Sequence, residues 1–293
     1  MSDSMFIGLV THPKTRFPEA SGPAGLAGLL TQELTSLGWS TQLSVIAENL
    51  VDSSLLALTQ SSITNSIRRE MAIERDWNKF QHQRVGAITG RILLRFRELF
   101  RLAKTRIPTA SARDSARRQI LRLANIETAH LTLLREGEES DADWVLILED
   151  DAINPDVPGL SKELDSNLRM WAGEPQPSYV NLSRSFSLDR LKHGGSLTNE
   201  GPWSKNSHIV SSTVPFTNTV CAVLYRKDFL QALNRELTAI PLEPVVPIDW
   251  KINLALMRLS SKGLLGERDC YTINPAPILQ GSMLTDDQDT KAR

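Results

Sequence analysis

The sequence predicts an α/β fold, because its first fifty residues hold the pattern of a βαβ unit. Residues 5–10 (MFIGLV) form a short apolar run that is typical of a buried strand. Leucines then recur at helical spacing up to Gly38, which is placed to end a helix, and residues 41–46 supply a second strand. A later run, 144–148 (WVLIL), is the clearest buried strand of the chain and supports the same class.

The rest of the chain continues this alternation. Further strands are predicted at 179–182, 219–225 and 270–273, and helices at 228–237 and 249–259. The segment 189–214 is rich in Gly, Ser, Asn and His and predicts a loop or flap, and the polar tail 285–293 is expected to fray. We interpret residues 1–293 as a single domain.

Composition narrows the classes of function. A chain of 293 residues that is 41% hydrophobic can bury a large core, and its net charge of -1 offers no general case for nucleic-acid binding. Cys221 and Cys270 lie far apart without metal-site spacing, which favours two reduced thiols and a cytoplasmic location. The N-terminus lacks a signal-peptide pattern, and no stretch approaches the ~20 apolar residues that span a bilayer.

A basic helical insertion is predicted at 60–118. Between residues 84 and 122 the chain holds eleven Lys or Arg against two acids, a local balance of +9. An apolar stripe within it has arginines on both sides, so the helix either packs on the core with a solvated basic face or lies on an anionic membrane through the cations from Arg91 to Arg106. After Pro108 a second helix is expected from Ala112 to Arg135, with Gly137 as its end.

Three consecutive carboxylates, Glu149, Asp150 and Asp151, follow the strand at 144–148 without a break. They repel one another, and packing does not require them there. In α/β sheets ligands bind beyond the carboxyl ends of the strands, and Mg²⁺ or Mn²⁺ is held there by one or two carboxylates and by substrate phosphates. Asp150 and Asp151 are the predicted metal ligands, with Glu149 in support. The alternative is that these acids cap a turn or are solvated.

Three segments around this cluster resemble the core of glycosyltransferase family 25, which includes lipopolysaccharide and collagen galactosyltransferases. They are Ile-Glu-Thr-Ala-His at 126–130, Leu-Arg-Glu-Gly at 134–137 and the strand that ends in Glu-Asp-Asp-Ala at 149–152. Two later pieces agree in order, Pro-Ile-Asp-Trp at 247–250 and the proline and glutamine segment at 274–280. The departures are Ala129, where the family has serine beside the histidine, and the segment 11–16, which differs from the family's opening turn.

The resemblance implies a GT-A-like fold, a mixed and mainly parallel sheet flanked by helices with a nucleotide-binding half and an acceptor half. It implies transfer of a sugar from a nucleotide-sugar donor to a hydroxyl of a glycan or lipid-linked acceptor, with inversion and with Mn²⁺ or Mg²⁺. Asp249 is the candidate base, or only the N-cap of its helix. Lys14, Arg16 and Asp150 are candidate contacts of the nucleotide sugar, although the two cations fit a solvated loop equally well. His130 fits a packing residue better than a catalyst.

Two other functions remain open on the sequence. A nucleotidyltransferase uses a related sheet with metal-bound acids, but the glycine-rich, basic loop usual after its first strand is missing here. A non-catalytic protein could instead bind anionic lipid or RNA through the basic helix, with structural acids, although few aromatic residues accompany the cations.

Overall fold

The computed structural model describes residues 3–12, 15–47, 50–51, 110–172, 177–184, 196–212, 217, 219–240, 247–266 and 269–281, with the backbone alone described at 110–120 and 184. The expected basic helix from Arg91 to Arg106 and the tail 285–293 lie outside these residues, so both stay predictions. Of the predicted insertion, 110–118 is described, and it is the first part of a long helix.

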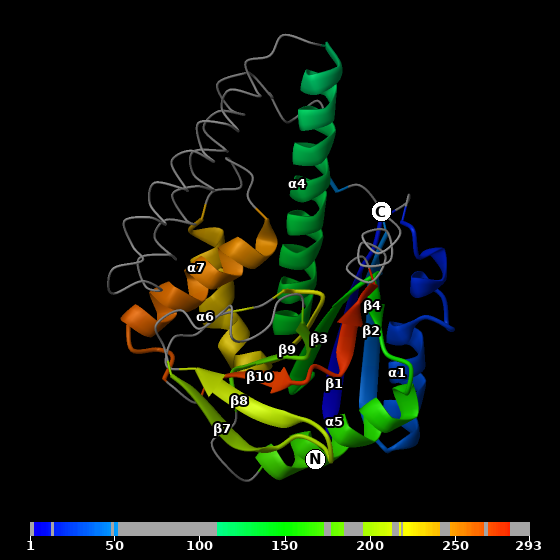
Figure 1. Ribbon diagram of the computed structural model, residues 1–293, viewed down its shortest axis with the longest axis vertical. Helices are drawn as coiled ribbons and strands as arrows, with labels where there is room; N and C mark the ends of the chain where they lie inside the picture. The colour runs from blue at the N-terminus through cyan, green and yellow to red at the C-terminus, as the bar shows by residue number, and fades with distance from the viewer. Residues whose placement is uncertain are drawn as a thin grey trace, which may run out of the picture.

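An eight-stranded mixed sheet forms the centre of the fold (Figure 1). Its order is β2 (Ser40–Ile46), β1 (Ser4–Val10), β3 (Trp144–Glu149), β9 (Ala222–Arg226), β5 (Tyr179–Asn181), β10 (Cys270–Asn274), β8 (His208–Ser212) and β7 (Leu197–Pro202). β1 runs parallel to β2 and to β3, and β5 runs parallel to β10, whereas the other neighbours are antiparallel. The predicted α/β class and mixed sheet are therefore confirmed.

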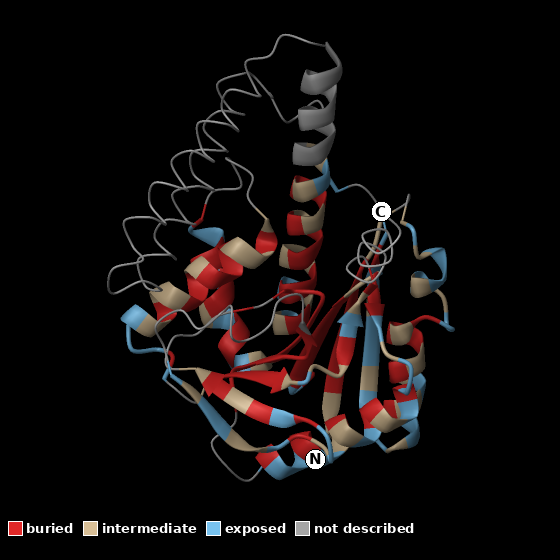
Figure 2. Cartoon of the chain, in the orientation of Figure 1, coloured by how far each residue is buried: buried red, intermediate tan, exposed pale blue. Residues whose placement is uncertain are grey.

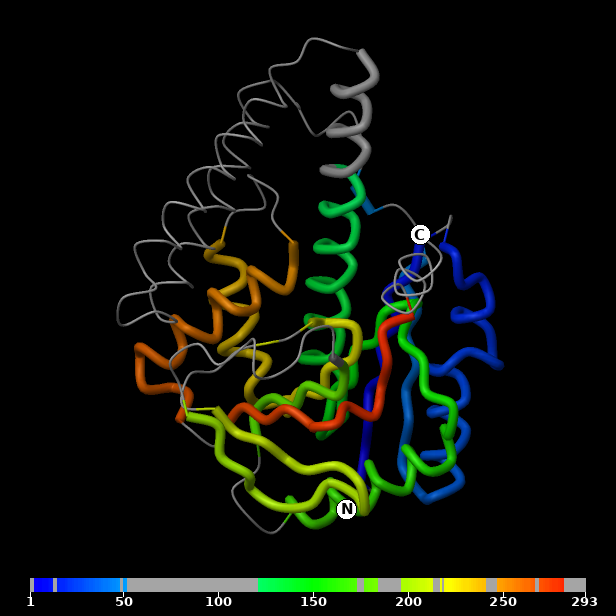
Figure 3. The backbone as a smooth tube through the Cα atoms, viewed as in Figure 1, coloured from blue at the N-terminus to red at the C-terminus, as the bar shows by residue number. Residues whose placement is uncertain are grey.

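A small second sheet brings the end of the described chain next to the acidic cluster. It consists of β4 (Ala152–Ile153), β11 (Ile278–Gln280) and β6 (Ser183–Arg184), with β11 in the middle. Gln280 pairs with Ala152, and the amide of Gly281 donates to the carbonyl of Asp151. The chain path in Figure 3 shows this approach of β11 to β4.

Helices cover both faces of the large sheet, because alternate residues of its strands point to opposite sides. Met5, Ile7 and Leu9 pack in one core with α1 (Leu26–Ser36) and α5 (Val157–Trp171). Phe6 and Val10 pack in the other with α4 (Ala110–Glu139), α6 (Lys227–Thr238) and α7 (Ile248–Ser261). A short 3-10 helix, η1 (Pro18–Ser21), precedes α1. The central strands are buried, whereas the edge strands β2 and β7 carry exposed residues (Figure 2).

Three expectations about local structure need correction or addition. The region 189–214 is not simply a loop: it contains the antiparallel pair of β7 and β8, whose polar outer faces hide the strand pattern. Gly137 does not end its helix, which continues to Glu139; a Cβ there would lie 2.7 Å from Cγ1 of Val145, so the glycine lets α4 approach β3 closely. Helix α5 was not predicted, although Leu160, Leu164, Leu168 and Trp171 repeat at helical spacing.

Among the helices that the structure describes, none has the length and apolar composition needed to cross a membrane.

Candidate active site

The three carboxylates leave β3 in different directions. Asp151 is buried and accepts a hydrogen bond from the Cys221 thiol, with 3.4 Å between Sγ and Oδ1. Asp150 accepts one from the Thr11 hydroxyl, with 3.2 Å between Oγ1 and Oδ2. Glu149 turns toward α4, where its Oε1 lies 3.0 Å from Nε2 of His130. The three acids are consecutive in the sequence, but their side chains contact three different parts of the fold, which are the segment before β9, the segment after β1, and α4.

Among the described residues, Glu149, Asp151 and Cys221 form a group that could share a cation. One ligand atom from each lies within 4.8 Å of the others. Two carboxylate oxygens suit Mn²⁺ or Mg²⁺, whereas sulfur is a softer ligand. Burial and the neighbouring acids, Asp151 first, raise the pKa of the Cys221 thiol well above its usual value, which keeps it a hydrogen-bond donor to Asp151. The donor set therefore fits a hard divalent ion held by Glu149 and Asp151.

A cavity of about 350 Å³ opens over this group. Glu149, Asp150 and Asp151 line it from the strand end, and Arg16 and Arg122 line it from the loop after β1 and from α4. Both arginines are exposed, so their charges are available to a ligand. Carboxylates beside cations suit an anion that carries a metal ion, as a metal-bound diphosphate does. Of the residues predicted for the site, Arg16, Asp150 and Asp151 line this one cavity, and their binding of a ligand stays a prediction, whereas Lys14 lies outside the described residues.

His130 is buried, with 1% of its surface exposed, and holds Glu149 from the side of the core. A carboxylate can only accept, so the ring N–H at Nε2 donates to Glu149. The other ring nitrogen, Nδ1, has no hydrogen-bond partner among the described residues. His130 therefore has a packing position, as the sequence favours, but it also orients a candidate metal ligand, in the way that metal sites commonly fix their carboxylates.

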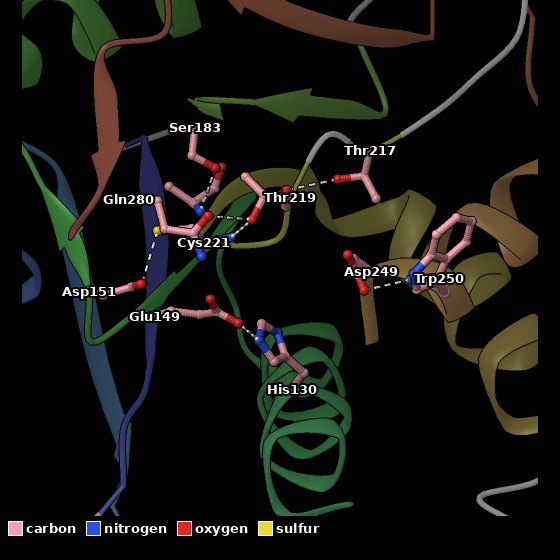
Figure 4. A network of polar contacts seen from close by, with 11 residues as sticks. His130, Glu149, Asp151, Ser183, Thr217, Thr219, Cys221, Asp249, Trp250 and Gln280 are labelled. Carbon is pink, nitrogen blue, oxygen red and sulfur yellow. Dashed lines mark hydrogen bonds and ion pairs between the residues drawn. The ribbon is translucent and has the colours of Figure 1, made fainter. Parts of the chain in front are cut away.

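Asp249 reaches the same region from α7. It is not the N-cap of that helix, which is Pro247, and no side chain among the described residues caps the helix start. The Asp249 carboxylate instead accepts from the amide of Trp250 at 2.9 Å. Burial raises the pKa of Asp249 to about 6, with Glu149 raising it further and His130 opposing the shift. Figure 4 shows Asp249 across from Glu149 and His130, although Asp249 is not among the residues that line the cavity.

A loop before β9 closes the upper side of this arrangement (Figure 4). The Thr219 hydroxyl lies 3.5 Å from Oε1 of Gln280 and accepts from the amide of Cys221 at 3.3 Å. Asn181, which is fully buried, donates to the Thr219 carbonyl at 2.8 Å and to the Thr217 hydroxyl at 2.9 Å. The position of Cys221 beside Asp151 is therefore fixed by polar contacts within this loop and from two strands, β5 and β11.

Sequence reasoning missed Arg122 and Cys221. Arg122 belongs to a run of arginines, and nothing in the run marks the one that faces the cavity; its position eight residues before His130 on a helix is the signal that could have singled it out. Cys221 carries no motif at all. Its place is set by the antiparallel pairing of β9 with β3, a long-range contact that a local pattern cannot show.

A larger cavity, about 930 Å³, lies at the opposite end of β3 and includes Asp3, Asp143 and Asp228. These acids already have partners: Asp3 pairs with Arg169, Asp143 accepts from Ser4, and Asp228 pairs with Arg226. The acids at the smaller cavity have hydrogen-bond partners too, but among the described residues it is there that two carboxylates offer ligand atoms within 4.8 Å of one another, so we place the candidate site at the smaller cavity.

Comparison of the sequence with protein-family models finds no match, and comparison with curated proteins finds none either. The function is therefore inferred from the geometry of the site and from the sequence motifs that surround it.

Proposed function

We propose that this protein is a metal-dependent glycosyltransferase that transfers a sugar from a nucleotide-sugar donor to a hydroxyl of a glycan or lipid-linked acceptor. The observation that carries the proposal is the cavity beyond the carboxyl end of β3, where Glu149, Asp150 and Asp151 meet Arg16 and Arg122. A nucleotide sugar presents a diphosphate, which needs both a cation held by acids and direct contacts from basic side chains.

The chemistry follows from where charge develops. When the bond between the sugar and the diphosphate breaks, negative charge grows on the departing phosphate. Glu149 and Asp151 would hold Mn²⁺ or Mg²⁺, which when bound would supply Lewis-acid stabilisation of that charge. Arg16 and Arg122 add fixed positive charge on two sides of the same cavity. Asp150, which accepts a hydrogen bond from the Thr11 hydroxyl, is the third carboxylate of the acidic cluster.

Asp249 is the proposed base for the acceptor hydroxyl. A pKa of about 6 leaves it mostly ionised near neutral pH and still basic enough to take a proton in the transition state. Direct attack by the acceptor inverts the configuration at the sugar carbon. Because Asp249 comes from α7 while the carboxylates come from β3, the two groups approach the reacting centre from different elements.

The architecture supports a GT-A-like assignment within this proposal. The parallel strands β2, β1 and β3 form the half that carries the acidic cluster, and the antiparallel β9, with α6 and α7, begins the other half. We assign the first half to the nucleotide sugar and the second to the acceptor. A contact with membranes through the cations from Arg91 to Arg106 remains a separate proposal.

A thermal-shift screen of nucleoside diphosphates with and without Mn²⁺ tests the donor site, and hydrolysis of UDP-, GDP- and dTDP-sugars with Mn²⁺ tests the reaction. We expect at least one nucleoside diphosphate to stabilise the fold only when Mn²⁺ is present. Absence of any stabilisation across the panel, together with absence of sugar release, would refute the proposal. Formation of nucleotide sugar from sugar phosphate and nucleoside triphosphate would indicate a nucleotidyltransferase instead.

A further inference from the structure

A buried ion pair joins α4 to α7. The Lys251 ammonium donates to Oε1 of Glu127, and each side chain is only 1% exposed. Burial raises the pKa of Glu127 to about 7, although Lys251 opposes the shift. The second oxygen, Oε2, is buried without a hydrogen-bond partner among the described residues. Apolar residues of similar volume usually hold a core as well as a buried ion pair does, so packing alone does not account for this one.

The same turns of α7 have a second polar anchor. Asn253, which is also buried, accepts from the amide of Thr217 at 2.7 Å and donates to the Thr217 carbonyl at 3.3 Å. The start of α7 is therefore tied to α4 through Lys251 and to the segment before β9 through Asn253. Both contacts have specific geometry, whereas apolar packing would tolerate a small sliding of the helix.

Asp249 lies two residues before Lys251, so this attachment decides where its carboxylate stands. On α4, His130 follows Glu127 by three residues and therefore lies on the same side of the helix, one turn further along. The ion pair thus holds the start of α7 beside the turn of α4 that carries His130, whose ring contacts Glu149. The groups whose charges act on Asp249 are Glu149 and His130, on β3 and α4.

We propose that Glu127 and Lys251 are positioning residues, which hold α7 on α4 in the register that puts the Asp249 carboxylate opposite His130 and Glu149. The ion pair matters because it sets the position of Asp249, and not because it raises the stability of the fold. Its consequence for turnover depends on the proposed role of Asp249 as base, but its consequence for the surroundings of Asp249 does not.

The test replaces both charges with apolar side chains of similar volume, Glu127→Leu with Lys251→Met. The matched control is Lys262→Met, which removes the Lys262–Glu236 ion pair at the other end of α7, where the lysine is 53% exposed. Carbon-13 NMR of labelled aspartate, with Asp249→Asn for assignment, measures the pKa of Asp249 in each folded protein. Thermal unfolding, donor KM and kcat are measured in parallel.

We expect the double variant to unfold at a temperature no lower than the original protein, because the apolar pair keeps the packing. The pKa of Asp249 should fall from about 6 toward 3.8 as its carboxylate becomes solvated, and Lys262→Met should leave it unchanged. Turnover should drop by about 10²-fold with donor KM unchanged, the size of effect that a misplacement of about 1 Å produces.

An unchanged pKa of Asp249 in the folded double variant overturns the proposal, whatever the turnover. If the original protein transfers no sugar while the pKa of Asp249 still falls in the variant, the positioning role stands and the proposed function fails. Should the double variant not fold, Lys251→Met alone serves, because Glu127 then becomes neutral by binding a proton; the same fall in the pKa of Asp249 is expected.

Discussion

Asp151→Asn is the sharpest test of the metal site, because it removes one charge while keeping the side-chain shape. The carbonyl oxygen of the substituted amide can still accept from the Cys221 thiol, so this contact is kept. The substitution removes one of the two carboxylates whose oxygens lie within 4.8 Å of each other. Asp150→Asn is the informative comparison, because Asp150 contacts Thr11 and is not in that group.

The size of the effect can be worked out from these contacts. Loss of a group that only orients a metal ligand costs about 10- to 100-fold in metal affinity, so loss of a ligand should exceed about 100-fold. A nucleoside diphosphate with Mn²⁺ at about 100 times its Kd stabilises the original protein by about 2.7 kcal/mol. At the same concentrations, an affinity weaker by about 100-fold leaves about 0.4 kcal/mol. With about 2 °C per kcal/mol for a large domain, the shift in Tm falls from about 5 °C to under about 1 °C.

The assay is thermal unfolding with and without Mn²⁺ and the nucleoside diphosphate selected by the screen. Asp143→Asn is the matched control, because Asp143 sits at the other end of β3 and accepts from Ser4. Asp150→Asn should keep most of the Tm shift. If Asp151→Asn keeps the shift as well, Asp151 is not a metal ligand. If Asp151→Asn and Asp150→Asn both abolish the shift, the pair Asp150 and Asp151 predicted from the sequence is the correct ligand set.

Three further substitutions test the surroundings. Asp249→Asn should lower turnover by ~10² to 10⁴ at unchanged donor affinity. The same substitution should raise the free energy of unfolding at pH 7 by up to ~3 kcal/mol, measured by urea unfolding. The reason is that burial favours the neutral carboxyl of Asp249: its contribution to stability is complete below pH 3.8 and is lost as the pH rises through its pKa of about 6. His130→Ala should weaken Mn²⁺ binding by ~10- to 100-fold in calorimetry by freeing Glu149, and equal affinity would make His130 a packing residue only. Gly137→Ala should lower the free energy of unfolding by up to ~2 kcal/mol, since crowding against Val145 outweighs the gain in helix propensity; a rise of ~1 kcal/mol would show that the added Cβ does not crowd Val145 and that Gly137 is an ordinary position inside the helix.

The fold could be predicted where the spacing of apolar residues along the sequence shows which side chains are buried. The strands at 5–10 and 144–148 are apolar throughout because helices cover both faces, and the structure has β1 and β3 there. β7 and β8 escaped prediction because they lie at the sheet edge, with exposed polar residues, so their sequence resembles a loop. The antiparallel place of β9 between β3 and β5 could not be read locally, because strand order depends on contacts far apart in sequence.

The candidate site likewise has residues that a local pattern predicts and residues whose place depends on contacts far apart in sequence. Asp151 could be singled out because a charge at the end of a buried strand has no role in packing, and Arg16 because it follows β1 closely. Glu149 was expected to support the metal ligands, yet the structure places it in the group with Asp151. Glu149 is the last residue of β3, whereas Asp150 and Asp151 form the turn that follows, so the alternation of the strand does not fix where these two side chains point. The sequence alone therefore cannot tell which of the three acids come together.

Helix α4 connects these observations, because its contacts reach both halves of the proposed site. Arg122 lines the cavity, Glu127 binds Lys251 of α7, and His130 orients Glu149 of β3. A helix is stiff along its axis, so these three groups keep fixed spacings and move together. The distance of α4 from β3 is set near Gly137, where the absence of a side chain allows Val145 to pack against the helix backbone. A substitution there should therefore weaken Mn²⁺ binding as well as stability, although Gly137 lies about two turns from His130 along the helix.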